Sequence, residues 1–241
     1  MKIGIVVIAR LQSSRLTEKH LLPVLGRPIL SILLQRISAA FTDDLIIATA
    51  DELDNRRLEL LSTKVFYGSR ANIPLRLLQV CETLNYDAIV SVDGDDILCA
   101  INGMRAVRSA LEKGRAYVAT VGLPLGMNVA GYSRSFLAHS LANHETETLE
   151  TGWGRVFDPE ALEKIPFPSK PEYDHLRLTL DYQEDFAFFE SVINHFKLYI
   201  ESATDQEIID YAIASNAYKL NKSVAKQYWE DFQRNVDKEA K

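Results

Sequence analysis

The sequence predicts an α/β protein built on one mostly parallel β-sheet with helices on both faces. Short apolar runs alternate along the chain with longer segments whose apolar residues recur at helical spacing. The short runs do not alternate apolar with polar residues, as expected of strands that helices cover on both faces. With 241 residues, 47% of them hydrophobic, the chain can bury one sizeable core. We therefore expect a single domain over residues 1–241.

The order of elements follows from these patterns. The expected strands are the short apolar runs Ile3–Ile8, Leu45–Thr49, Val65–Tyr67, Ala88–Val92, Tyr117–Val121 and, after a long gap, Leu176–Leu180. Pro28 suits the first turn of a helix, and Asn72 suits the N-cap of the next one. The spacing predicts helices over Pro28–Phe41, from Asn72 to Leu84, and over Met104–Lys113, Glu184–Phe196, Asp205–Leu220 and Ser223–Val236.

Two stretches depart from this alternation. Residues 123–174 carry clusters of Gly, Pro, His and Glu, which are typical of loops. We expect them to form a loop-rich insertion rather than part of the core. Residues 197–241 are expected to form a helical C-terminal extension.

Composition excludes several classes of function. The net charge of −6 and the pI near 5.5 argue against nucleic-acid binding, which normally needs a basic face. No apolar run approaches the roughly 20 residues of a membrane-spanning helix, so we expect a cytoplasmic protein. Cys81 and Cys99 lack metal or redox spacing and are predicted to be reduced packing residues. The histidines form no recognisable metal site either, and we expect surface or packing roles for them.

The stretch IARLQSSRLTEK follows the first expected strand, where open α/β sheets commonly bind phosphate. Arg10 and Arg15 can fork onto phosphate oxygens, and Lys19 adds a point charge. Ser13 and Ser14 can complete the cradle with backbone N–H groups. The segment lacks the glycines of a Walker loop or a dinucleotide fingerprint. A solvated basic loop is the alternative interpretation.

The stretch SVDGDD follows the fourth expected strand and concentrates three carboxylates around one glycine. Such a concentration of negative charge is costly beside a buried strand unless a cation offsets it. Mg²⁺ suits Asp93, Asp95 and Asp96, because it binds one or two carboxylates together with phosphate oxygens and water. An Asp/Gly turn is the alternative.

The stretch HLRLTLDYQED delivers Asp181 at the end of the last expected strand. Asp181 could serve as a second metal carboxylate. It could instead cap the following helix, with Glu184 three residues later completing a capping box.

Together these motifs resemble a known family. The order ARLQSSRLTEKHLLPVLGRPIL, VFYGS, GDD, PLGMNVAGYSRSFL and HLRLTLDYQED resembles the cytidylyltransferases of the spore-coat polysaccharide type. It is also similar to the CMP-sugar synthetases that act on 3-deoxy-manno-octulosonate and sialic acids. The resemblance covers residues 2–193. It implies a Rossmann-like core of the nucleotide-diphospho-sugar transferase kind, in which a sugar-acid hydroxyl attacks the α-phosphate of CTP and displaces pyrophosphate.

The resemblance also implies residue roles. Arg10, Arg15 and Lys19 would hold the triphosphate, and Asp95 and Asp181 would bind Mg²⁺. Residues near the nucleotide would be Gly68, Ser69 and Arg76. The 123–174 insertion would form the acceptor-site walls and a homodimer contact.

The sequence departs from the family pattern at several positions. Thr17–Glu18 replaces the usual Pro-Gly pair and would place a carboxylate beside the phosphate site, at some cost in phosphate affinity. Asp93 replaces Thr or Gln, and could accept from the exocyclic amine of cytosine or disturb the metal. Trp153 and Arg155 could stack on a sugar and grip its carboxylate, although a buried loop or dimer anchor is the alternative for Trp153.

Two other functions remain open from the sequence. Asp93-Gly94-Asp95 is a D-x-D pattern, which also occurs in metal-dependent glycosyltransferases that use a nucleotide sugar. The departures at Glu18 and around Asp95 would also fit a nucleotide-binding relative that has lost catalysis.

Overall fold

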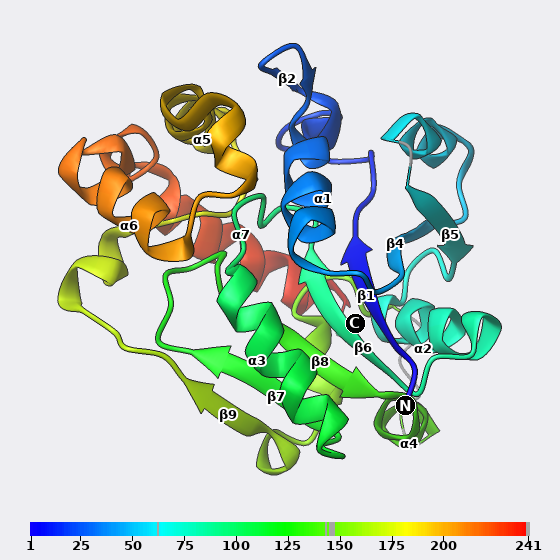
Figure 1. The fold of residues 1–241 in the computed structure, drawn as a ribbon. Coiled ribbons are helices and arrows are strands. Elements are labelled where there is room, and N and C mark those ends of the chain that lie inside the picture. Colours follow the sequence, from blue (N-terminus) through cyan, green and yellow to red (C-terminus); the bar gives the residue numbers. More distant parts are fainter. Residues whose placement is uncertain (62, 143, 145–147, 240–241) are drawn as a thin grey trace.

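The computed structural model describes residues 1–61, 63–142, 144 and 148–239. A seven-stranded sheet in the order β5-β4-β1-β6-β8-β7-β9 forms its centre (Figure 1). The sheet strands are β1 (Ile3–Ile8), β4 (Leu45–Ala50), β5 (Lys64–Gly68), β6 (Ala88–Asp93), β7 (Tyr117–Val121), β8 (Ala130–Ser133) and β9 (Glu163–Pro166). A separate two-stranded ribbon pairs β2 (Pro23–Val24) with β3 (Arg27–Pro28). The predicted α/β fold with a mostly parallel sheet is confirmed.

The first four expected strands form the parallel half of the sheet. β1 pairs with β4 on one side and β6 on the other, and β5 extends the sheet beyond β4. Ile5 and Val7 join one hydrophobic cluster with α1 (Ile29–Ala40) and α3 (Ile101–Glu112). Val6 and Ile8 join another with α2 (Ile73–Leu84) and α4 (Arg134–Ala142). The uninterrupted apolar run of β1 therefore reflects helices on both faces.

The antiparallel half contains two strands that the sequence does not predict. β8 lies between β6 and β7 and is antiparallel to both, and β9 runs parallel to β7 at the sheet edge. Both strands, together with α4, come from residues 123–174, so the expectation of an insertion outside the core is wrong for this part of it. Residues 143 and 145–147 of that segment, and 240–241 of the C-terminal extension, lie outside the described residues.

The expected strand Leu176–Leu180 is wrong as a sheet strand. The segment is extended, but its backbone bonds to loops: Leu178 N–H donates to the Leu125 carbonyl, and Leu180 N–H donates to the Asp95 carbonyl. Its leucines pack into a third cluster with α5 (Gln183–Phe196) and α6 (Asp205–Ala214). The bond to Asp95 still brings Asp181 to the end of β6.

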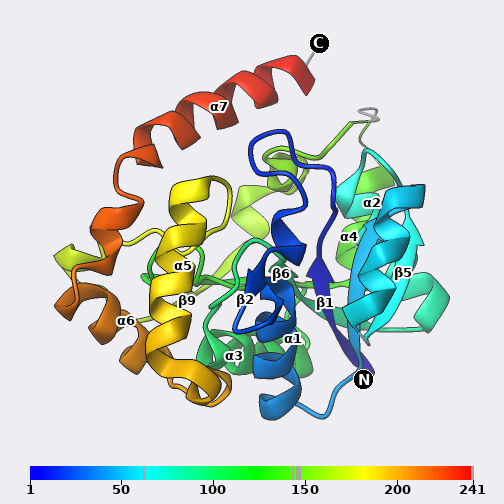
Figure 2. The same cartoon turned by 90° about the horizontal axis from the view of Figure 1, so that it is seen from above.

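Most expected helices are present. The side chain of Asn72 caps α2 by accepting from Leu75 N–H at 2.8 Å. The single helix expected over Asp205–Leu220 is wrong, because α6 ends at Ala214 and a separate 3-10 turn covers Ala217–Leu220. Asn216, with φ at 58°, makes the left-handed turn between them. The last helix, α7, covers Val224–Glu239 and crosses one end of the molecule (Figure 2).

Both cysteines are free and buried, as the sequence predicts. Within the described ranges, no helix combines the length and the apolar character needed to cross a membrane.

Candidate active site

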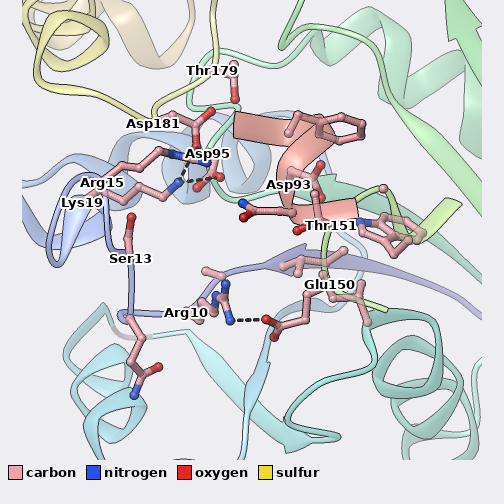
Figure 3. A pocket seen from close by; sticks show the side chains of 18 of the residues that line it. Arg10, Ser13, Arg15, Lys19, Asp93, Asp95, Glu150, Thr151, Thr179 and Asp181 are labelled. Atoms are coloured by element: carbon pink, nitrogen blue, oxygen red, sulfur yellow. Dashed lines mark hydrogen bonds and ion pairs between the residues drawn. The ribbon is translucent and has the colours of Figure 1, made fainter. Parts of the chain in front are cut away.

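A cavity of about 400 Å³ opens beyond the carboxyl ends of β1 and β6. Because the two strands are parallel neighbours, the loops that follow them emerge side by side at this edge. The cavity is lined by most of the predicted site residues, namely Arg10, Ser13, Ser14, Arg15, Lys19, Arg76, Asp93, Asp95 and Asp181. Figure 3 shows side chains from both loops pointing into it. The parallel pairing of β1 and β6 therefore brings the loops that follow these strands together. The extended 176–180 segment brings Asp181 to the same place.

Lys19 lies between the two predicted metal carboxylates. Its Nζ is 2.7 Å from Asp95 Oδ2 and 3.0 Å from Asp181 Oδ1 (Figure 3). Burial disfavours the charged ammonium, but the two carboxylates outweigh burial and raise the pKa of Lys19 above its ordinary value. Lys19 is therefore a charged group in an almost fully enclosed position, with 6% of its surface exposed.

Two arginines complete the surroundings of Asp181. Arg15 Nη2 is 2.6 Å from Asp181 Oδ1, and Arg177 Nη2 is 2.9 Å from the other oxygen. Burial opposes the charge on both guanidinium groups, but the neighbouring carboxylates raise their pKa. Arg177 also pairs with the buried Asp185. Asp181 thus holds its position through three cations, of which Arg15 and Lys19 are residues predicted to hold the triphosphate.

The alternative role of Asp181 as a helix cap is wrong. The residue that closes the start of α5 is Asp185, whose Oδ2 accepts from the backbone N–H groups of Asp181 and Tyr182, both at 3.0 Å. Glu184, the expected partner of a capping box, takes no part in these bonds. The carboxylate of Asp181 is left to face the cavity.

His20 orients Asp95, a role that the sequence does not indicate. Its ring is buried, with Nδ1 2.9 Å from the Arg10 carbonyl oxygen and Nε2 2.9 Å from Asp95 Oδ1. Both partner atoms are acceptors, so a neutral imidazole, with its single N–H, can donate to only one of them, and donation to both requires the imidazolium. Although burial opposes it, the charge of Lys19 and the bond from His20 hold the pKa of Asp95 well below its usual range. A lone histidine near a basic loop carries no pattern that could have predicted this contact.

Asp93 differs from the other carboxylates of the cavity. Its side chain makes no hydrogen bond or ion pair within the described part of the chain, and it is open to the cavity. Although its side chain is exposed to the cavity, the surrounding protein disfavours the charged form, and the nearby Asp95 charge adds to this, so the pKa of Asp93 rises to about 7.

A second ion pair lies at the other side of the cavity. Arg10 Nη1 is 2.5 Å from Glu150 Oε2 (Figure 3). Glu150 is held there because Leu149 forms a parallel bridge with Asn72 at the start of α2. Arg76 is buried nearby; burial lowers its pKa to about 10, against the opposing influence of Glu150. The sequence predicts a nucleotide contact for Arg10 and Arg76 but not the carboxylate that faces them.

The predicted nucleotide residues Gly68 and Ser69 do not line this cavity. Gly68 is the last residue of β5 and Ser69 follows it, and Ser69 is linked to the cavity through Arg76, whose Nε donates to the Ser69 carbonyl at 2.9 Å. The Ser69 N–H itself donates to the Gln79 side chain at 2.8 Å. Of these three predicted nucleotide residues, only Arg76 lines the cavity, and Ser69 is bonded to the Arg76 guanidinium.

The expected interference from Glu18 is wrong. Its carboxylate pairs with Arg57 and is not among the cavity-lining groups. The backbone at Glu18 has φ 50°, the left-handed region that favours glycine. The Pro-Gly to Thr-Glu replacement thus changes backbone strain rather than the charge beside Lys19.

Trp153 and Arg155 have different surroundings. Trp153 lines the cavity and also packs on Tyr132 and Phe157, with ring centroids 5.9 Å away in both cases. It therefore serves as a packing anchor that keeps one side open to the cavity. Arg155 does not line the cavity; it binds the Thr151 carbonyl and the Glu239 carboxylate.

The donor set suits a magnesium ion that arrives with phosphate. In the described residues no group of three or more His, Cys, Asp or Glu side chains is arranged to hold a metal on its own. Asp95 and Asp181 do offer two carboxylates that converge on one ammonium. Mg²⁺ usually takes one or two carboxylates and completes its coordination with phosphate oxygens and water. The pair fits that use and does not form a complete protein cage.

Comparison with known proteins identifies the family. The sequence model described as cytidylyltransferase matches residues 4–238. An uncharacterized protein of Methanocaldococcus jannaschii is 31% identical over 88% of this chain and 90% of its own length. The spore coat polysaccharide biosynthesis protein SpsF of Bacillus subtilis is 26% identical over 75% of this chain and 82% of its own.

Solved structures share the fold. A cytidylyltransferase from Leptospira borgpetersenii has a TM-score of 0.80 at 22% identity, covering 92% of this chain and 98% of its own. A CMP:2-keto-3-deoxy-manno-octonic acid synthetase complexed with CTP has a TM-score of 0.61 at 13% identity, covering 81% and 99%. With the fold, the cavity and the match over nearly the whole chain in agreement, the protein belongs to the cytidylyltransferase family of nucleotidyltransferases.

Proposed function

We propose that this protein transfers CMP from CTP to a sugar acid and releases pyrophosphate. The observation that carries the proposal is the meeting of Arg15 and Lys19 with Asp95 and Asp181 in one cavity. The cations suit the phosphates of a nucleoside triphosphate, and the two carboxylates suit the Mg²⁺ that accompanies it. Family membership supports the use of CTP.

The charge balance of the cavity supports a requirement for a divalent cation. Four basic residues, Arg10, Arg15, Lys19 and Arg76, line it together with four acids, Asp93, Asp95, Glu150 and Asp181. The acids, of which Asp93 is only partly charged near neutral pH, thus offset most of the positive charge before a triphosphate of about four negative charges enters. Bound Mg²⁺, held by Asp95 and Asp181, would supply neutralisation of phosphate charge.

The remaining chemistry needs positioning rather than a protein nucleophile. The acceptor hydroxyl oxygen bonds to the α-phosphorus and loses its proton to solvent, and the bond to the bridging α–β oxygen breaks with its electron pair leaving on pyrophosphate. Arg15 and Lys19 would hold the phosphates in place for this displacement. Asp93, whose side chain has no hydrogen-bond partner among the described residues, is the group we propose to accept from the exocyclic amine of the cytosine.

The acceptor class follows from relatives rather than from a residue of this cavity. One structural neighbour is a synthetase of a CMP-linked 2-keto-3-deoxy acid, and one relative is a polysaccharide biosynthesis protein. We therefore propose a 2-keto-3-deoxy sugar acid used for a surface polysaccharide. The cytoplasmic location, the homodimer and the acceptor role of residues 123–174 stay predictions.

The experiment supplies CTP, Mg²⁺ and a panel of 2-keto-3-deoxy sugar acids and measures pyrophosphate. Acceptor-dependent release by the wild type, lost in Asp95→Asn, is expected; release that is unchanged in Asp95→Asn would contradict the metal assignment. Calorimetry with CTP and with UDP-sugars separates the proposal from a glycosyltransferase. CTP binding without any turnover of a labelled substrate would instead favour a relative that has lost catalysis.

A further inference from the structure

The C-terminal helix α7 forms part of the cavity wall. Tyr228, Phe232 and Asn235 line the cavity, and their spacing of four and three residues puts them on one face of the helix. Figure 2 shows α7 crossing the end of the molecule where the loop after β1 emerges. Among its described residues only Val224 is buried. The helix is therefore only partly buried, and its polar contacts with the rest of the protein include the bond that Asp231 accepts from Tyr182 and those of Glu239.

Glu239, at the end of α7, makes the most concentrated of these contacts. Its carboxylate accepts from the backbone N–H of Thr151 at 2.8 Å and of Glu150 at 3.2 Å. Arg155 Nη2 lies 3.1 Å from the same carboxylate, whose side chain is 13% exposed. Glu239 thus fixes the backbone of the segment that carries Glu150.

The Glu150 carboxylate binds a guanidinium group that a phosphate would also bind. It pairs with Arg10, one of the four basic side chains of the cavity, and its charge also reaches Arg76. Arg10 is half-exposed, so an entering anion has access to it. The guanidinium has further N–H donors that a phosphate can use, but the negative charge of Glu150, 2.5 Å from Nη1, lies close to any phosphate bound there and repels it.

We propose that Glu150 limits the affinity of the cavity for polyphosphates and that Glu239 acts through it as a positioning residue. The inference rests on the proposed function insofar as the entering ligand is a triphosphate. A phosphate bound to Arg10 then has to displace the Glu150 carboxylate or remain beside its like charge. The unfavourable free energy of either depends on α7, because Glu239 holds the Glu150 backbone against the cavity.

The first test compares Glu150→Gln with the wild type by calorimetry, using inorganic triphosphate and CTP at low ionic strength. The isosteric amide removes the competing charge, and the dissociation constants of both probes are expected to fall by about threefold or more, the worth of a half-exposed ion pair. Glu160→Gln, an exposed acid outside the cavity, is the matched control and is expected to leave both constants unchanged.

The second test addresses Glu239. Glu239→Gln is expected to tighten triphosphate binding in the wild type and to have no further effect in the Glu150→Gln background, because both changes act on the same pair. A purely structural role would weaken binding or leave it unchanged. Asp237→Asn is the control on the same helix, since Asp237 binds Gln233 outside the cavity.

The outcomes separate the inference from the proposed function. Equal affinities of Glu150→Gln and the wild type for both probes would contradict the inference alone. Weaker CTP binding in Glu150→Gln with unchanged binding of inorganic triphosphate would also contradict it, by making Glu150 a nucleoside contact. Failure of every variant to bind either probe would contradict the inference and the triphosphate site together.

Discussion

Replacement of Lys19 by methionine tests whether its ammonium and a metal ion use the same place. Lys19→Met keeps most of the side-chain volume and removes the charge that lies 2.7 Å from Asp95 and 3.0 Å from Asp181. Breaking a buried ion pair by removing one partner typically costs 3–5 kcal/mol. Asp95 keeps His20, and Asp181 keeps Arg15 and Arg177, so we expect the lower end, about 3 kcal/mol.

The assay is urea or thermal unfolding with and without excess Mg²⁺. Without Mg²⁺ the loss corresponds to a fall in Tm of about 6–12 °C for a chain of this size. Added Mg²⁺ is expected to restore a large part of the loss in Lys19→Met, because the ion stabilises the folded state that binds it. The wild type should respond less, since Lys19 already neutralises both carboxylates.

Two results would refute this reasoning. The double variant Lys19→Met with Asp95→Asn should lose the Mg²⁺ response, and an undiminished response would mean that the ion binds elsewhere. A Lys19→Met protein as stable as the wild type in the absence of Mg²⁺ would mean that the ammonium does not hold the two carboxylates.

Three further predictions concern the loops around the cavity. Glu18→Gly should relieve the left-handed backbone and raise stability by about 1 kcal/mol, less the small contribution of the exposed pair with Arg57, as measured by urea unfolding. Asp93→Asn should stabilise the protein above about pH 7 and have no effect below about pH 4, as measured by Tm against pH in a chelator. Gly94→Ala should cost about 1–3 kcal/mol in urea unfolding, because its Cβ would lie 2.7 Å from the Ile8 carbonyl oxygen.

The sign for Asp93 follows from its raised pKa. Between the unfolded value near 4 and the folded value of about 7, the folded protein holds a proton that the unfolded chain has lost. Stability therefore falls as the pH rises through this window, and Asn removes the fall. An effect of Asp93→Asn on stability that does not change with pH would contradict this prediction. Loss of stability in Glu18→Gly would contradict the prediction for Glu18, and unchanged stability in Gly94→Ala would contradict the prediction for Gly94.

The parallel half of the fold was predictable because its strands are continuous apolar runs. The two missed strands lack that signal. β8 contains Gly131, where a Cβ would lie 2.5 Å from Val107, so close packing against α3 selects glycine rather than a β-branched residue. β9 is a mostly exposed edge strand that ends in Pro166. The opposite error at Leu176–Leu180 arose because extended chain bonded to loops has the same apolar pattern as a strand.

Arg15, Lys19 and Asp95 were predictable because loops after neighbouring parallel strands must meet. Asp181 joined them through a backbone bond between Leu180 and Asp95, which no local pattern specifies. Glu150 and the α7 residues enter the cavity from positions more than 130 residues beyond Arg10, and only tertiary packing determines that approach. Glu18 shows the limit of arguing from charge alone, since its backbone turns the carboxylate toward Arg57.

The position of the label after turnover tests the central claim most directly. Wild-type protein is incubated with Mg²⁺, the panel of 2-keto-3-deoxy sugar acids, and CTP labelled at either the α- or the γ-phosphate. We predict that the α label appears in a CMP-linked acid and the γ label in pyrophosphate. Label that stays in CTP with every acid, or an α label released as free CMP alone, would contradict the account.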